Sequence, residues 1–180
     1  DMVIFIYRPE YYGLTTFEKD DVPSEGLADI MIEKNRHGAN DRIRIAVAGF
    51  NGRGRAHLRC YAEMKDVEIA YLVDVDSRLF PAATTLVAKA AGNTPQCVQD
   101  LRKALEDRNL DAVSLATPNH THSLLAIWAC QAGKDVYVEK PCSHNIFEGR
   151  KLVEASRKYD RIVQHGTQRR ADPKWQKLIA

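Results

Sequence analysis

The stretch Ile43-Arg44-Ile45-Ala46-Val47-Ala48-Gly49-Phe50-Asn51-Gly52-Arg53-Gly54 joins an apolar, β-branched run directly to a glycine-rich turn. The run has the composition of a buried strand, and the turn is a near-match to G-x-G-x-x-G with Asn51 at the second glycine position. In that pattern the glycines allow a tight turn, approach of the backbone to a pyrophosphate and close packing of the next helix. Asn51 tolerates left-handed backbone, and Gly52 beside it can supply the missing freedom. We therefore predict a strand–loop–helix unit whose helix N-terminus holds a phosphate.

From Arg42 onward, apolar runs alternate with amphipathic stretches, and each ends in turn residues. This alternation is typical of βαβ units and predicts an α/β fold with a doubly wound parallel sheet of the Rossmann type. We expect strands at 43–48, 67–73, 111–116, 134–139 and 161–165, and a weaker one at 96–98. We expect helices at 54–64, 78–91, 100–108, 121–132 and 146–158, the last opened by a capping box of Asn145 and Glu148.

An acid follows the second predicted strand. Asp74 lies twenty residues after Gly54, the spacing at which dinucleotide-binding units place the carboxylate that binds the adenosine ribose. A carboxylate there repels a 2′-phosphate and favours NAD, whereas Arg78 nearby would favour NADP. We expect NAD, with NADP as the alternative. The competing interpretation is an ordinary α/β domain with a structural glycine turn and a surface Asp74.

A second informative run is Asp135-Val136-Tyr137-Val138-Glu139-Lys140-Pro141, a predicted strand that ends in an acid, a lysine and a proline. Parallel sheets of α/β proteins bind ligands at the carboxyl ends of their strands. Lys140 is therefore expected to face a substrate. The alternative is that Lys140 is one more solvated cation, as most lysines are.

Polar residues follow two further predicted strands. Thr117-Pro118-Asn119-His120-Thr121-His122 comes after one of them, and a helix cap with polar contacts to the nicotinamide side of a cofactor fits it better than a zinc site. Zinc needs three or four ligands, which this spacing does not supply, so we expect no metal. Gly166-Thr167-Gln168-Arg169-Arg170 follows the other, and its arginines suit either an anionic or polyhydroxyl ligand or a solvated face.

Composition limits the function classes. The chain has 180 residues, the length of one ordinary domain, and a formal net charge of +2 from 26 Lys+Arg and 24 Asp+Glu, which gives little attraction for nucleic acid. The four cysteines are far apart and form no C-x-x-C pair. No apolar stretch approaches the roughly 20 residues of a membrane span, and no signal peptide is present, although the chain opens on Asp1. We expect a cytoplasmic protein whose true N-terminus lies elsewhere, and no membrane partner.

With these motifs in place, residues 43–180 resemble the nucleotide-binding domain of the glucose-fructose oxidoreductase and inositol dehydrogenase family, Gfo/Idh/MocA. The resemblance is carried by 48–54 with His57, 74–76, 116–119 with His122, 132–134, Glu139-Lys140-Pro141 and 166–169. It implies NAD(P)-dependent hydride transfer at a carbinol carbon of a sugar or polyol. Lys140 would be catalytic, contacting the substrate hydroxyl and the nicotinamide ribose and stabilising alkoxide character.

The motifs and the resemblance together give a set of expected cofactor contacts. They are Gly49, Phe50, Asn51, Gly52, Arg53, Gly54, Asp74, Arg78, Thr117, Pro118, Asn119, His122, Glu139, Lys140, Gln168 and Arg169. In the family, proton transfer depends on residues of a second, sheet-rich domain, which would begin about where this chain stops at Ala180. We therefore expect the C-terminal substrate domain to be missing, and leave open whether the chain turns over alone.

Residues 1–41 resemble the C-terminal end of the ATPase domain of DnaB-type replicative helicases. The carrying segments are 5–12 and 32–38, and the resemblance implies that Lys34 and Arg36 match residues that reach a neighbouring subunit's γ-phosphate. No G-x-x-x-x-G-K-[ST] occurs in the chain, so the phosphate cradle of an ATPase is absent from the sequence. We expect a fusion, with a β-hairpin-like helicase fragment at 1–41 that packs loosely and an NAD(P)-binding Rossmann domain at 42–180.

Three functions follow in order of preference. The first is the NAD(P)-binding domain of a sugar or polyol oxidoreductase, with a small-molecule partner and self-association into a homo-oligomer left open. The second is an NAD-dependent glycoside hydrolase of the same fold, whose distinguishing residues would lie in the missing domain. The third is a remnant of an ATP-dependent DNA helicase, against which the absent ATP loop and near-neutral charge argue.

Overall fold

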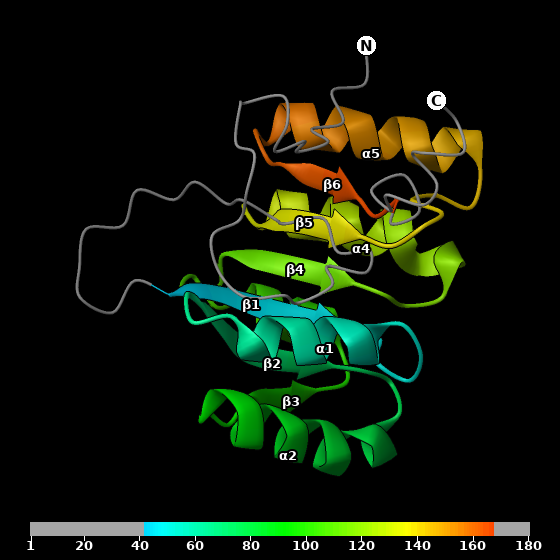
Figure 1. Cartoon of the computed structure of the whole chain (residues 1–180). Coiled ribbons are helices and arrows are strands. Elements are labelled where there is room, and N and C mark those ends of the chain that lie inside the picture. The colour runs from blue at the N-terminus through cyan, green and yellow to red at the C-terminus, as the bar shows by residue number, and fades with distance from the viewer. Residues whose placement is uncertain (1–41, 168–180) are drawn as a thin grey trace, which may run out of the picture.

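The computed structural model describes residues 42–167 as a six-stranded sheet with helices on both faces (Figure 1). The strand order is β3-β2-β1-β4-β5-β6, and every neighbouring pair runs parallel. The order reverses at β1, where the chain crosses from one half of the sheet to the other. This arrangement confirms the predicted doubly wound Rossmann fold.

The elements have the following bounds. The strands are β1 (Ile43–Ala48), β2 (Val67–Val73), β3 (Gln96–Val98), β4 (Ala112–Leu115), β5 (Asp135–Val138) and β6 (Val163–His165). The helices are α1 (Gly54–Glu63), the 3₁₀ turn η2 (Ser77–Leu79), α2 (Phe80–Ala91), α3 (Leu101–Leu105), α4 (Asn119–Gln131) and α5 (Ile146–Lys158). Asn145 caps α5 as predicted, because its side-chain oxygen accepts the backbone N–H of Glu148 at 2.9 Å.

The helix predicted at 78–91 is divided into the 3₁₀ turn η2 and α2, which begins at Phe80, and two further helices differ from the predicted ranges by two residues or more. The helix predicted at 100–108 ends at Leu105, because the carbonyl oxygens of Asp107 and Leu110 turn toward the ammonium group of Lys134, 2.7 and 2.8 Å away. The helix predicted at 121–132 begins at Asn119 instead, directly after Pro118. Proline fixes a φ that suits a helix start, so the helix follows it without a gap.

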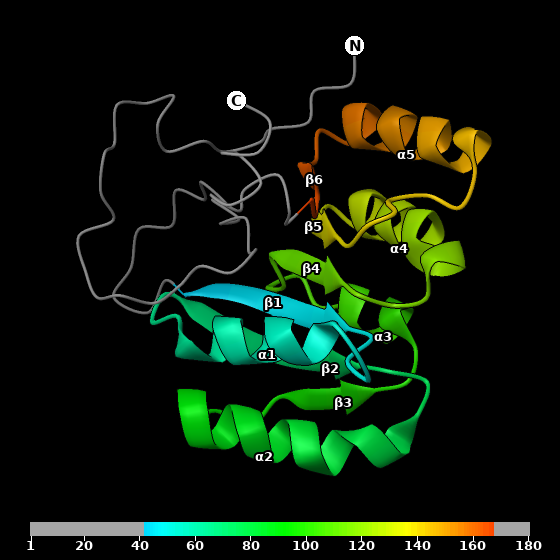
Figure 2. The same ribbon diagram turned by 45° about the vertical axis from the view of Figure 1, so that its right-hand side comes forward.

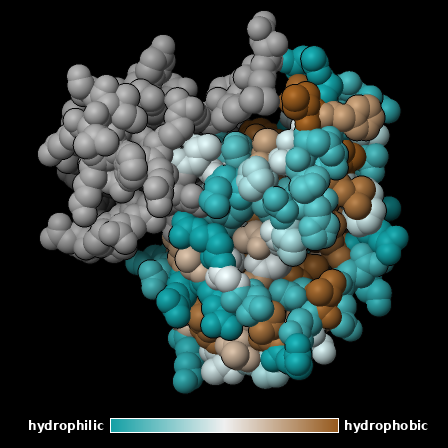
Figure 3. Space-filling view, turned by 90° about the vertical axis from the view of Figure 1, so that its right-hand side faces the viewer, coloured by the Kyte–Doolittle hydropathy of each residue, from teal (hydrophilic) through white to brown (hydrophobic). Residues whose placement is uncertain are grey.

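The sheet is covered on both faces (Figure 2). Side chains alternate along β1, so Ile45 and Val47 pack with α1 and α2 while Ala46 and Ala48 pack with α3, α4 and α5. Short alanines at this central strand let the second layer of helices approach closely. Because all strands are parallel, their carboxyl ends meet at one edge, which Figure 3 views from the front and where patches of apolar residues lie within a largely hydrophilic surface.

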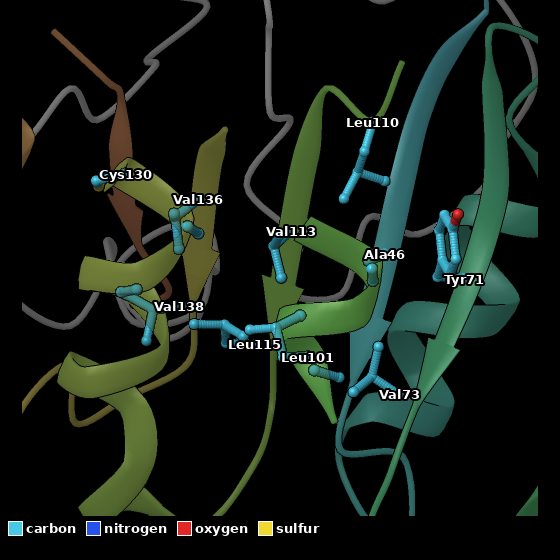
Figure 4. Packing of buried hydrophobic residues seen from close by; sticks show 14 of the residues in the cluster. Ala46, Tyr71, Val73, Leu101, Leu110, Val113, Leu115, Cys130, Val136 and Val138 are labelled. Atoms are coloured by element: carbon cyan, nitrogen blue, oxygen red, sulfur yellow. The ribbon is translucent and has the colours of Figure 1, made fainter. Parts of the chain in front are cut away.

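The larger core lies between the sheet and α3, α4 and α5 (Figure 4). Val113, Leu115, Val136 and Val138 from the central strands are all at most 2 % exposed, and Leu101 reaches them from α3. Burying a side chain of this size contributes about 1.5–3 kcal/mol relative to leaving it in water. Within residues 42–167, no helix combines the length and the apolar character that a membrane crossing needs.

The segment 1–41, with its predicted hairpin and helicase-like motif, lies outside the described residues. Gln168 and Arg169, two of the expected cofactor contacts, also lie outside them.

Candidate functional site

The glycine loop after β1 depends on two glycines that no other residue can replace without strain. Gly49 has a φ of +78°, and a Cβ there would come within 2.6 Å of the backbone nitrogen of Thr117. A Cβ on Gly54 would collide with the carbonyl oxygen of Gly49. The loop is therefore folded tightly against itself and against the end of β4.

The structure corrects one expectation about this loop. Neither Asn51 nor Gly52 has a positive φ, so the left-handed turn is made at Gly49. Both residues are exposed, and a Cβ on Gly52 would meet nothing within 4 Å. Asn51 is tolerated at the second glycine position because its backbone there is not left-handed and the residue is exposed.

Helix α1 begins immediately after the loop and presents an N-terminus suited to an anion. Its cap is Arg53, whose side chain is 40 % exposed, and its first turn contains no acidic residue. The backbone N–H groups and dipole at a helix N-terminus attract negative charge. The loop closed tightly at Gly54, the helix N-terminus and the exposed Arg53 together form a cradle of donor groups that can attract an anion.

Asp74 is fixed beside this cradle. One of its carboxylate oxygens accepts the backbone N–H of Phe50 at 3.1 Å, and the other accepts that of Asp76 at 3.0 Å. The acid thus bridges the glycine loop and the loop that leads into η2. Its position at the end of β2 is the one that suits hydrogen bonds to a ribose.

Arg78 is held by Asp76 rather than aimed at Asp74. Its Nε and one terminal nitrogen each lie 2.8 Å from a different oxygen of the Asp76 carboxylate. The Arg78 guanidinium holds the pKa of Asp76 below its ordinary value. This pairing occupies the cation that could otherwise favour a 2′-phosphate.

Thr117 to His122 occupy the end of β4 and the first turn of α4. Pro118 takes the cap position, so no side chain caps this helix, contrary to the expected polar cap. His122 is 2 % exposed, and its ring nitrogens lie 2.7 Å from the carbonyl oxygen of Thr117 and 2.6 Å from that of Pro141. It ties the β4 end to the β5 end, whereas Thr117, Pro118 and Asn119 stay at the surface or partly exposed.

Glu139 and Lys140 follow β5 and point to different environments. Lys140 is exposed, and among the described residues its ammonium group makes no salt bridge. Glu139 is only 4 % exposed and accepts hydrogen bonds from Arg53 Nε at 3.2 Å and His57 Nε2 at 2.9 Å. The acid therefore lies beneath the rim that the lysine occupies.

Two polar residues of this site were not predicted as site residues from the sequence. His57 is fully buried in α1, and its Nδ1 lies 2.9 Å from the hydroxyl of Ser114 in β4. A serine inside the apolar run 112–115 is the signal that could have revealed it, because a buried hydroxyl needs a partner.

The end of β6 adds a histidine to the same edge. Burial lowers the pKa of His165 below its ordinary value, and His122 lowers it further, while Glu139 acts in the opposite direction. Its Nε2 has no hydrogen-bond partner among the described residues. In the part of the chain that the structure describes, no three His, Cys, Asp or Glu side chains gather in a way that could hold a metal ion.

The ends of β1, β2, β4 and β5 thus bring together four expected elements at one edge: the glycine loop, Asp74, Thr117 to Asn119, and Lys140. Residues 43–167 match the family described as "Oxidoreductase family, NAD-binding Rossmann fold". Myo-inositol 2-dehydrogenase of Thermotoga maritima is 31 % identical over 137 residues, which are 76 % of this chain and 39 % of that protein. The crystal structure of GenD2 from gentamicin A biosynthesis, in complex with NAD, superposes with a TM-score of 0.66 at 28 % identity, covering 76 % of this chain and 38 % of that one.

A separate short similarity concerns the helicase family. The replicative DNA helicase DnaB of Rhodothermus marinus is 50 % identical over 46 residues, 26 % of this chain and 5 % of the helicase. This match covers too little of the helicase to assign the helicase's function to the chain. The chain spans about two fifths of the length of the Thermotoga maritima dehydrogenase and of GenD2. On the match across residues 43–167 and the Rossmann sheet, this chain belongs to the Gfo/Idh/MocA family of oxidoreductases with an NAD-binding Rossmann fold.

Proposed function

We propose that residues 42–167 bind NAD as the cofactor half of an oxidoreductase that moves a hydride between nicotinamide and a carbinol carbon of a sugar or polyol. The observation that carries the proposal is the Asp74 carboxylate, held by the backbone N–H groups of Phe50 and Asp76 at the mouth of the glycine loop. An acid preset in this position offers two acceptor oxygens to ribose hydroxyls.

The other residues of the site contact different parts of the dinucleotide. The N-terminus of α1 and Arg53 take the pyrophosphate, and the loop from Gly49 to Gly54 lets it approach the backbone. Thr117, Pro118 and Asn119 line the nicotinamide side. The pairing of Arg78 with Asp76 supports NAD over NADP, because the guanidinium is already occupied and a second acid adds negative charge near the ribose.

Lys140 is the residue of this cofactor-binding domain that takes part in the reaction. Nicotinamide, when bound, accepts or returns the hydride. The Lys140 ammonium group is exposed on the rim that ends β5, where it can donate to the substrate oxygen whose negative charge grows during hydride transfer. Myo-inositol, named for the Thermotoga maritima relative, is a polyol with such carbinol carbons, and supports this substrate class.

Ligand titration of the full chain tests the proposal. NAD should raise the melting temperature progressively with its concentration, by the equivalent of about 2.7 kcal/mol at a hundredfold excess over Kd. Asp74→Ala should abolish the shift, whereas Glu154→Ala, which removes an exposed carboxylate on α5, should preserve it. Stabilisation by ATP but not by NAD would overturn the proposal and favour a nucleotide triphosphate site.

A further inference from the structure

Glu139 is a buried carboxylate that joins three parts of the site. One oxygen, Oε1, accepts both Arg53 Nε from the glycine loop and His57 Nε2 from α1. The other, Oε2, accepts the backbone N–H of Lys140 at 3.3 Å. A carboxylate removed from water is stabilised only by such donors, so each of them constrains the position of the others.

With a neutral His57 ring, the chain of hydrogen bonds behind Glu139 has one consistent direction. The Tyr61 hydroxyl donates to Ser114 Oγ at 3.4 Å, and the Ser114 hydroxyl can then donate to His57 Nδ1. This leaves Nε2 as the protonated nitrogen of the His57 ring, which donates to Glu139. In this tautomer every member from Tyr61 to Glu139 has its partner.

Packing keeps His57 from turning away. The ring is fully buried and meets the ring of Tyr137 edge-on, with 5.4 Å between centroids. The ring of Tyr61 also meets the His57 ring edge-on, with 6.2 Å between centroids. His57 therefore keeps one orientation beneath Glu139, because side chains of α1, β4 and β5 contact its ring.

We propose that Glu139, held by His57, is a positioning residue that couples the glycine loop to Lys140 without itself touching the cofactor. Arg53 faces the pyrophosphate cradle and Lys140 faces the substrate side, and the same carboxylate orders both. The inference deepens the proposed function, on which its ligand measurements rest, but its spectroscopic tests need no ligand.

The first test reads the His57 ring directly. In ¹⁵N spectra of the full chain the His57 imidazole should show the Nε2–H tautomer. A ring protonated on Nδ1 alone could not donate to Glu139 and would overturn the proposal.

The second test measures the coupling in the absence of ligand. With ¹⁵N-lysine labelling and assignment through Lys140→Arg, the Lys140 amide resonance should move in Arg53→Gln, because the charge opposite the shared carboxylate changes. When Arg53→Gln is added to the Glu139→Gln variant, the Lys140 amide resonance should not move. A Lys140 amide that ignores Arg53, or that responds equally without the Glu139 carboxylate, contradicts the coupling.

The third test uses ligand affinity and a matched set of variants. Glu139→Gln and His57→Phe should weaken NAD binding about tenfold, the scale of one charge-assisted hydrogen bond, and leave adenosine binding unchanged, since adenosine carries the ribose that Asp74 holds and no phosphate for Arg53. Glu154→Gln should change neither, and His57→Gln, which keeps a donor, should recover part of the NAD affinity. Equal losses for NAD and adenosine would mean general unfolding and contradict the positioning role. A wild-type chain that binds no NAD would refute the proposed function and leave the two spectroscopic tests standing.

Discussion

The carboxylate of Asp74 accepts the backbone N–H of Phe50 at 3.1 Å, so the acid at the end of β2 and the glycine loop at the end of β1 hold each other. The residue proposed to bind the ribose therefore also orders the loop proposed to bind the pyrophosphate. Such mutual support lowers the cost of ordering both parts when a ligand arrives.

Cofactor choice should respond to the partner of Arg78. In Asp76→Ala the guanidinium loses its bidentate carboxylate and can turn toward a 2′-phosphate. We expect the ratio of NADP to NAD affinity to rise about tenfold, the scale of a hydrogen bond to a charged group, in fluorescence titrations of both cofactors. The double variant Asp76→Ala with Arg78→Ala should lose most of this rise and keep only the part that comes from removing the Asp76 charge. An unchanged ratio in the single variant would contradict the role of Arg78.

The glycine loop provides a matched pair of substitutions. Gly54→Ala places a Cβ against the Gly49 carbonyl oxygen and should lower the free energy of unfolding by about 1–3 kcal/mol. Gly52→Ala adds a Cβ in open space at a negative φ and should leave stability within about 0.5 kcal/mol of wild type or slightly raise it. Urea denaturation followed by circular dichroism checks both, and equal effects would show that the loop is not packed as described.

The strand–loop–helix unit and the position of Asp74 at the end of β2 could be predicted from the sequence, because both depend on spacings between residues that are close along the chain. The ranges of β1, β2 and α5 follow from periodicity and a capping pair within one segment. The orientation of Glu139 could not be predicted, since its partner His57 lies 82 residues away and no local pattern indicates that the acid turns inward while Lys140 turns outward. The tight turn at Gly49 was expected from the first glycine, but the close approach of Thr117 to it could not be predicted, because Thr117 follows another strand.

A buried lysine should matter more to stability than its exposed counterparts. Lys134 is 5 % exposed, and its ammonium group donates to the carbonyl oxygens of Asp107, Arg108 and Leu110. Lys134→Met removes these donors and should lower the free energy of unfolding by about 2–4 kcal/mol, while the NAD affinity of the folded fraction stays the same. Lys151→Met, at a surface ion pair, should cost less than about 1 kcal/mol in the same denaturant titration.

His165 should make stability depend on pH. Burial lowers the pKa of His165 in the folded state, so below the ordinary value of 6.5 the unfolded chain binds more protons than the folded one. Stability should therefore be full above that value and fall as the pH drops through it. His165→Gln should flatten this part of the curve in urea midpoints measured from about pH 7 to about pH 5. His144→Gln, at an exposed histidine, serves as the control, and a curve unchanged by the His165 substitution would contradict the assignment.

Lys140 should affect binding without affecting the fold. Its side chain is exposed, and the described residues offer its ammonium group no salt bridge, so Lys140→Met should leave the melting temperature unchanged. If Lys140 contacts the nicotinamide ribose, calorimetric titration should show affinity for NAD and ADP-ribose falling about tenfold, because both carry that ribose, while affinity for ADP stays the same. Lys89→Met, at an exposed position on α2, should change none of the three. Wild-type affinity of Lys140→Met for ADP-ribose would place the lysine away from the cofactor and leave the substrate as its only proposed contact.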